Sequence, residues 1–231
     1  DVLLVASANP EDYTNRGRII TPLKDRFGSQ IRTHYPLDVD TEVAIMHQEA
    51  REASVGNVTV RVPSYIERVV ATFSQLARSS NHVNQRSGVS VRLSVSNVEV
   101  LAANALRRGL RAGEQSVVPR ICDLAALAAS TSGKVEIESL EEGREGLILE
   151  NLVKAAVLTV FKEQVPLDQV REVVDAFEAG VVAHTGEEIA SSELARLIDE
   201  MPALRTAVYS LAGGDESPAA IAAAVEFVLE G

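Results

Sequence analysis

The sequence has one cysteine, four histidines and no apolar run near the roughly 20 residues that a membrane span needs. The single Cys122 excludes an intramolecular disulfide framework and a cluster of thiolate metal ligands, and its Ala- and Leu-rich surroundings favour a small packing residue over a nucleophile. The histidines have neither metal-ligand spacing nor a recognisable nucleophilic partner. The first residues lack the basic lead and the length of a signal peptide, so we expect a cytoplasmic protein without a membrane partner.

A phosphate-binding loop is also missing. Such a loop needs Gly-x-x-x-x-Gly-Lys-Ser/Thr, because its backbone N–H groups wrap the phosphates while Lys neutralises them and the hydroxyl holds magnesium. The only Gly-Lys pair, Gly133-Lys134, is followed by Val135 and lacks the earlier glycine. No apolar strand ends in an Asp-Glu pair that could supply a magnesium ligand. We therefore expect neither tight ATP binding nor ATP turnover by this chain alone.

The charge is unevenly distributed. Residues 1–133 hold 15 Lys and Arg against 13 Asp and Glu, whereas residues 134–231 hold 7 against 20, so the two parts carry +2 and −13. This step predicts a domain boundary near Gly133. The acidic part would repel nucleic acid and suits a protein partner, so we do not expect nucleic-acid binding. All but one of the cations before Gly133 are arginines, a bias typical of phosphate or carboxylate recognition but also of a GC-rich genome.

Apolar residues recur mostly at helical spacing, which predicts a mainly α-helical chain. Asp38 or Asp40 is expected to cap the first helix, and Ser96 with Glu99 forms a capping-box pattern for a helix that ends near Gly113. Helices are expected over about 41–53, 96–111, 149–161 and 193–204. Four others are expected to begin at Pro63, Pro119, Pro166 and Pro218, and the one from Pro119 is expected to end at about 130. Short extended segments are expected around 58–62 and 135–137.

The first 28 residues carry the most specific pattern. An apolar strand, Val2-Leu3-Leu4-Val5, leads into Asn9-Pro10, and Arg26 follows within Pro22-Leu23-Lys24-Asp25-Arg26-Phe27-Gly28. This order resembles the sensor-1 and arginine-finger region of AAA+ ATPases, especially the branch of the magnesium-chelatase ATPase subunit and the MoxR-like proteins. A second strand is expected over 30–35. Because two strands alone cannot form a stable sheet, we expect the sheet and the phosphate-binding half of the fold to be completed outside this chain.

The resemblance implies a domain organisation. Residues 1–36 would be the end of a partial α/β AAA+ core, residues 37–133 a helical lid, and residues 134–231 an acidic C-terminal helical domain. The resemblance covers only the first 133 residues. For the last part the sequence indicates a helical domain without a known role.

The resemblance also implies two catalytic residues. Asn9 would be the sensor-1 residue, whose neutral amide contacts the γ-phosphate and orients the attacking water; taken alone, Asn-Pro is usually a turn. Arg26 would be an arginine finger that stabilises transition-state charge in a neighbouring subunit's site. The alternatives for Arg26 are a local ion pair with Asp25, and Arg16 or Arg18 as the finger instead.

A third candidate, for nucleotide binding, is Arg92. It lies in Val91-Arg92-Leu93-Ser94, just before the expected lid helix, where this branch places a sensor-2 arginine that contacts the γ-phosphate. An exposed loop arginine is the simpler interpretation, and Arg86, Arg107 and Arg108 are competing candidates.

The function implied by the resemblance is that of a ring-forming ATPase. Its relatives assemble into rings, often hexamers, and use ATP hydrolysis to remodel a partner that carries a von Willebrand A domain. ATP and Mg²⁺ would be the cofactors of the complete ATPase, with none bound by this chain alone and no metal ligands within it. The alternative is a non-enzymatic helical adaptor or interaction module in which the sensor-like residues are structural.

Overall fold

A computed structural model describes residues 2–7, 25–84, 88–137 and 143–231. The chain forms two compact units, Asp1–Tyr35 and Pro36–Gly231. In the first unit, residues 2–7 and 25–35 form no strand, and Val2, Leu3, Leu4 and Val5 are each at least 72% exposed. The expected strands over 2–5 and 30–35 are therefore not formed. An extended segment needs a neighbouring strand to pair with, and the described residues supply none.

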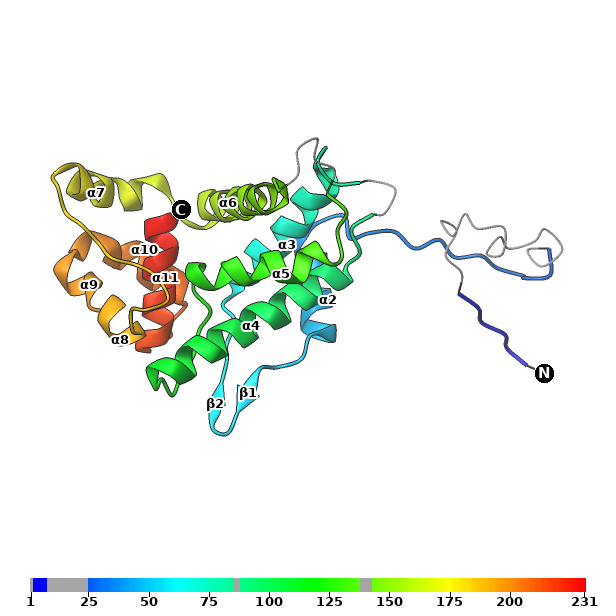
Figure 1. Ribbon diagram of the computed structural model, residues 1–231, viewed down its shortest axis with the longest axis horizontal. Helices are drawn as coiled ribbons and strands as arrows, with labels where there is room; N and C mark the ends of the chain where they lie inside the picture. Colours follow the sequence, from blue (N-terminus) through cyan, green and yellow to red (C-terminus); the bar gives the residue numbers. More distant parts are fainter. Residues whose placement is uncertain (1, 8–24, 85–87, 138–142) are drawn as a thin grey trace. The chain divides into compact units, whose positions relative to one another are not determined.

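The second unit is mainly helical, which confirms the predicted class (Figure 1). Its elements, in chain order, are α2 (Val39–Glu49), β1 (Ser54–Val55), β2 (Val58–Thr59), α3 (Ser64–Ser79), α4 (Arg92–Ala112), the 3₁₀ helix η1 (Ile121–Ala126), α5 (Leu127–Ser132), α6 (Glu145–Gln164), α7 (Leu167–Glu178), α8 (Ser191–Leu194), α9 (Leu197–Glu200), the 3₁₀ helix η2 (Pro202–Leu204), α10 (Arg205–Ala212) and α11 (Pro218–Glu230).

Several helix ends follow the local sequence. The Asp38 carboxylate accepts a hydrogen bond from the Thr41 N–H at 2.7 Å and caps α2. Gly113 ends α4 in a left-handed conformation, with φ of 70°. The helix expected from Pro119 is instead a 3₁₀ turn followed by the short α5. The weak pattern over 193–204 corresponds to α8, α9 and η2, and α10 was not predicted.

A small hairpin projects between α2 and α3. Strands β1 and β2 pair antiparallel around Gly56, whose positive φ of 59° suits the tight turn. Val60 then forms an isolated parallel bridge with Val117. Val117 packs directly on α4, because a Cβ at Gly109 would lie only 2.3 Å from Val117 Cγ2. Glycine at position 109 therefore lets this segment close against the helix.

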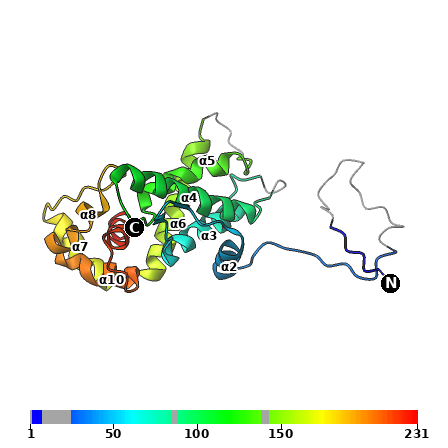
Figure 2. The same cartoon turned by 90° about the horizontal axis from the view of Figure 1, so that it is seen from below.

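The main core runs across most of the second unit. Helix α3 packs along α6, and α11 lies against α8 and α10 (Figure 1, Figure 2). The rings of Tyr65 and Phe227 are 4.8 Å apart, and those of Phe161 and Phe227 are 6.0 Å apart. The charge step near Gly133 therefore does not coincide with a break in packing. Net charge is a property of the surface, whereas these contacts lie in the interior.

Candidate functional site

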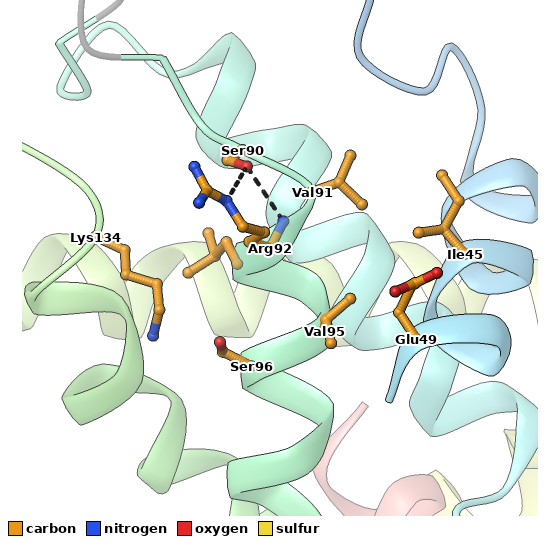
Figure 3. A pocket seen from close by; sticks show the side chains of 9 residues that line it. Ile45, Glu49, Ser90, Val91, Arg92, Val95, Ser96 and Lys134 are labelled. Atoms are coloured by element: carbon orange, nitrogen blue, oxygen red, sulfur yellow. Dashed lines mark hydrogen bonds between the residues drawn. The ribbon is translucent and has the colours of Figure 1, made fainter. Parts of the chain in front are cut away.

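An open cavity of about 600 Å³ lies where α4 begins (Figure 3). It is bordered by the start of α4, by the side of α2 and by the turn that follows α5. Its lining residues are Ile45, Glu49, Ser90, Val91, Arg92, Leu93, Val95, Ser96 and Lys134. The cavity therefore contains one of the three site residues expected from the sequence, together with a lysine that was not expected there.

Arg92 is the first residue of α4 and is exposed. The Ser90 hydroxyl oxygen accepts hydrogen bonds from the Arg92 backbone N–H and from its Nε, each at 3.3 Å. The two Nη groups have no hydrogen-bond partner among the residues that the structure describes. They are free to bind an anion, and the fork of a guanidinium suits phosphate or carboxylate oxygens.

The predicted start of this helix was wrong. Ser96 and Glu99 do not form an N-terminal capping box, because α4 begins at Arg92 and Ser96 lies inside it. Ser90 provides the local side-chain acceptor instead. Because α4 begins about one helical turn earlier than expected, Arg92 lies in the first turn of a helix at the cavity and not in a loop.

Lys134 enters the cavity from the turn after α5. Helix α5 ends at Ser132 with Gly133 as its C-cap, and the Lys134 N–H donates to the Thr131 carbonyl at 2.9 Å. The Lys134 ammonium donates one hydrogen bond to the Ser130 carbonyl at 3.0 Å. An ammonium has three donors, so two remain for a ligand.

The other side of the cavity is apolar and carries one acid. Ile45, Val91 and Val95 supply apolar surface, while Glu49 accepts a hydrogen bond from the Gln48 amide at 2.9 Å. With Arg92 and Lys134 against Glu49, the lining has a formal charge of +1. This arrangement can attract an anionic group and offers apolar contact to the rest of the same ligand.

A buried ion pair supports the wall from which Arg92 projects. Glu42 of α2 is 0% exposed and binds the Arg78 guanidinium through two hydrogen bonds of 2.5 and 2.6 Å. The Ser94 hydroxyl, in the first turn of α4, also donates to Glu42. The Arg78 Nε donates to the Val89 carbonyl at 2.9 Å. These contacts tie α2, α3 and α4 to the segment that leads into Arg92.

The sequence contains only one weak signal of this pair. Glu42 lies on the apolar face of α2, next to Met46 one turn later, and a charged residue on such a face indicates a buried partner. The partner could not be identified, because Arg78 is 36 residues away.

A second buried network lies outside the cavity. Arg120 is 0% exposed, donates to the carbonyls of Ile189 at 2.9 Å and Gly186 at 2.8 Å, and pairs with Glu226 of α11 at 3.1 Å. Burial raises the pKa of Glu226, against the opposing effects of Arg120 and the Cys122 amide. The network therefore fastens η1, α11 and the segment before α8 together.

The lone cysteine belongs to this second network. Its backbone N–H donates to Glu226 at 2.9 Å, and its Sγ lies 3.8 Å from the same carboxylate. Burial, with the nearby Glu226 carboxylate, raises the pKa of the Cys122 thiol to about 12. The thiol therefore stays protonated at neutral pH, which does not suit a nucleophile.

The other two predicted site residues belong to the first unit. Asn9 lies outside the described residues, as do the rival arginines Arg16, Arg18 and Arg86. Arg26 lies in a turn of the first unit and is exposed, and no ion pair with Asp25 is present in the part of the chain that the structure describes.

The described competitors of Arg92 do not line the cavity. Arg108 is 5% exposed and bound to Asp123 at 3.0 Å, so its charge is already neutralised by a buried partner. Arg107 is exposed and donates to Asn104 at 2.7 Å, but it does not line the cavity. Of these three arginines, only Arg92 lines the cavity.

No group of three or more His, Cys, Asp or Glu side chains suited to a metal ion occurs within residues 2–7, 25–84, 88–137 and 143–231. In the same residues, no helix is both long and apolar enough to cross a membrane. Comparisons of the chain with protein-family models, curated proteins and solved structures gave no match.

Proposed function

We propose that this chain is the C-terminal part of a ring-forming AAA+ ATPase, similar to the magnesium-chelatase ATPase subunit, that couples ATP hydrolysis to the remodelling of a partner protein. The observation that carries the proposal is Arg92. Its two Nη groups face no protein partner among the described residues, and it opens a 21-residue helix at the edge of a cavity. These are the properties that a sensor-2 arginine needs to contact a γ-phosphate.

In this proposal, the cavity is one side of a nucleotide site. Arg92 and Lys134 fit the charge of phosphate oxygens, while Ile45, Val91 and Val95 offer apolar surface. ATP supplies the phosphoryl group, and Mg²⁺ would be held by residues of the complete ATPase outside the described ones. The phosphate-binding loop belongs to another part of the same ATPase, so the cavity by itself binds nucleotide weakly.

The proposal assigns the remaining candidates to the same reaction. Asn9 orients the attacking water in its own subunit's site, and Arg26 acts on the site of a neighbouring subunit, which requires a ring oligomer such as a hexamer. The exposure of Arg26 suits a contact in trans, since a finger must be accessible to another subunit. A partner protein with a von Willebrand A domain would receive the mechanical work, in the cytoplasm.

The test is ATP hydrolysis by the complete ATPase carrying Arg92→Ala. We expect at least a tenfold loss of kcat/KM, because a charge-assisted contact to the transferred group is removed. Arg92→Lys should retain part of the activity through its charge. Arg107→Ala is the matched control, since Arg107 lies on the same helix and is exposed but does not line the cavity. Equal activity of the Arg92→Ala and Arg107→Ala enzymes would reject the proposed role and favour the adaptor function.

A further inference from the structure

Helix α7 presents an exposed apolar surface. Leu167 and Val174 lie two turns apart on the same face of the helix and are 75% and 52% exposed. Phe177, one turn beyond Val174, is 38% exposed. Val170 and Val173 lie on the same apolar face and pack into the core, so Leu167 and Val174 form its outer, exposed edge. Figure 1 shows α7 at the edge of the second unit.

The chain that follows α7 adds two exposed apolar residues, and its turn is fixed in position by hydrogen bonds. The Val181 N–H donates to the Ala176 carbonyl at 3.1 Å, and the Gly180 N–H donates to the Phe177 carbonyl at 2.9 Å. This pair of bonds, with Gly180 at φ of 94°, is a Schellman motif, which folds the chain back against the last turn of the helix. It holds Val181, 45% exposed, and leads directly to Val182, 73% exposed.

We name Leu167, Val174, Phe177, Val181 and Val182 the α7 surface. Its surroundings are strongly acidic. Asp168 follows Leu167 and Asp175 follows Val174, so these two acids form a row along the helix beside the row of the two apolar residues. Glu178 lies one turn after Val174. Helix α7 itself holds four acids, Asp168, Glu172, Asp175 and Glu178, against the single cation Arg171.

We infer that the α7 surface binds a peptide segment of a partner protein that has an apolar face flanked by Lys or Arg. The five apolar side chains supply the area to be buried, and the acidic row selects the charge of the partner. An apolar segment with acidic flanks would be repelled, and so would an anionic lipid surface or nucleic acid. The inference does not depend on the proposed ATPase, because it involves neither the cavity nor Arg92.

The test uses the full 231-residue chain and a fluorescent Leu/Lys peptide of about four helical turns, with leucines on one face and lysines on the other. Binding is measured by fluorescence anisotropy at low and at physiological salt. We expect saturable binding that weakens as salt is raised. A peptide of the same composition, scrambled so that it has no apolar face, should bind at least tenfold more weakly.

Variants then locate the site. Leu167→Asn and Val174→Asn should each weaken binding of the amphipathic peptide about tenfold, equivalent to about 1.4 kcal/mol. Asp175→Asn should weaken it at low salt and reduce its salt dependence. Leu110→Asn is the matched control: Leu110 is 47% exposed at the end of α4, and its change should leave affinity within about twofold. Circular dichroism establishes that each variant is folded.

Three results would overturn the inference. The first is equal affinity for the ordered and scrambled peptides, which would indicate only general attraction to an acidic protein. The second is an equal effect of Val174→Asn and Leu110→Asn. The third is a dimer of the free chain in sedimentation velocity that Val174→Asn abolishes, because a second copy would then be the occupant of the α7 surface.

Discussion

Replacing Arg78 by Met would break the buried pair that supports the start of α4. The Arg78 side chain is 12% exposed and its partner Glu42 is 0% exposed. In Arg78→Met the apolar stem of the side chain is largely kept. Of the hydrogen bonds to the Glu42 carboxylate described above, only the one from the Ser94 hydroxyl remains. The Val89 carbonyl also loses its hydrogen bond.

The expected cost is large because the remaining charge stays buried. Breaking a buried ion pair by removing one partner typically costs about 3–5 kcal/mol. For a chain of this size, each kcal/mol lowers the thermal midpoint by about 2–4 °C, so Arg78→Met should lower it by about 6–20 °C. An exposed pair provides the comparison. Lys154 and Glu150 lie 2.6 Å apart but are 69% and 57% exposed, and such pairs contribute about 0–1 kcal/mol.

Urea unfolding of the full chain, followed by circular dichroism, measures both costs as changes in the free energy of unfolding. The double variant Glu42→Gln/Arg78→Met should lose at least about 1 kcal/mol less than the sum of the single variants, since it leaves no unpaired charge. If Arg78→Met costs no more than Lys154→Met, or if the two single effects simply add, then the pair is not the buried support described here.

The other predictions concern Arg26, Gly109 and Glu226. In the assembled ATPase proposed above, Arg26→Ala should leave nucleotide binding near normal and lower turnover by orders of magnitude. Subunits with a broken phosphate-binding loop should partly rescue Arg26→Ala subunits but should not rescue Asn9→Ala subunits. Wild-type turnover by Arg26→Ala would reject the arginine-finger role. Gly109→Ala should destabilise the fold by about 1–3 kcal/mol in urea unfolding, because the new Cβ meets Val117, and adding Val117→Ala should recover part of that loss. Burial raises the pKa of Glu226 in the folded chain, so the contribution of Glu226 to stability is fully present below its unfolded pKa of about 4.3 and is lost as pH rises through the folded pKa. The stability advantage of the wild type over Glu226→Gln should therefore shrink with rising pH in parallel urea titrations. A difference that stays constant with pH would contradict this prediction.

Local patterns in the sequence predicted much of the helical structure. Asp38 and Gly113 marked ends of α2 and α4, because an N-cap carboxylate and a left-handed glycine act within one helical turn of their own position. The start of α4 was misplaced: Ser96 and Glu99 have the right spacing for a capping box, but the helix begins at Arg92, with Val91 as an N-cap that makes no side-chain hydrogen bond.

Features that depend on distant residues could not be predicted. The pairing of Glu42 with Arg78 and of Arg120 with Glu226 requires the tertiary fold, because many arginines and acids are available and nothing local selects among them. Lys134 reaches the Arg92 cavity only because α5 ends beside the start of α4. For the same reason, the charge step near Gly133 predicted a boundary that the interior contacts cross.

The closing of the core by α11 has a consequence for synthesis on the ribosome. Tyr65 meets Phe227, and Arg61 pairs with Asp215, 154 residues later in the chain. At about 5–20 residues per second, roughly 8–30 s pass between translation of these segments. During that time α3 has emerged without its final cover, and contacts of such sequence separation form late. We therefore expect the nascent chain to expose this apolar surface to solvent until α11 has emerged from the ribosome.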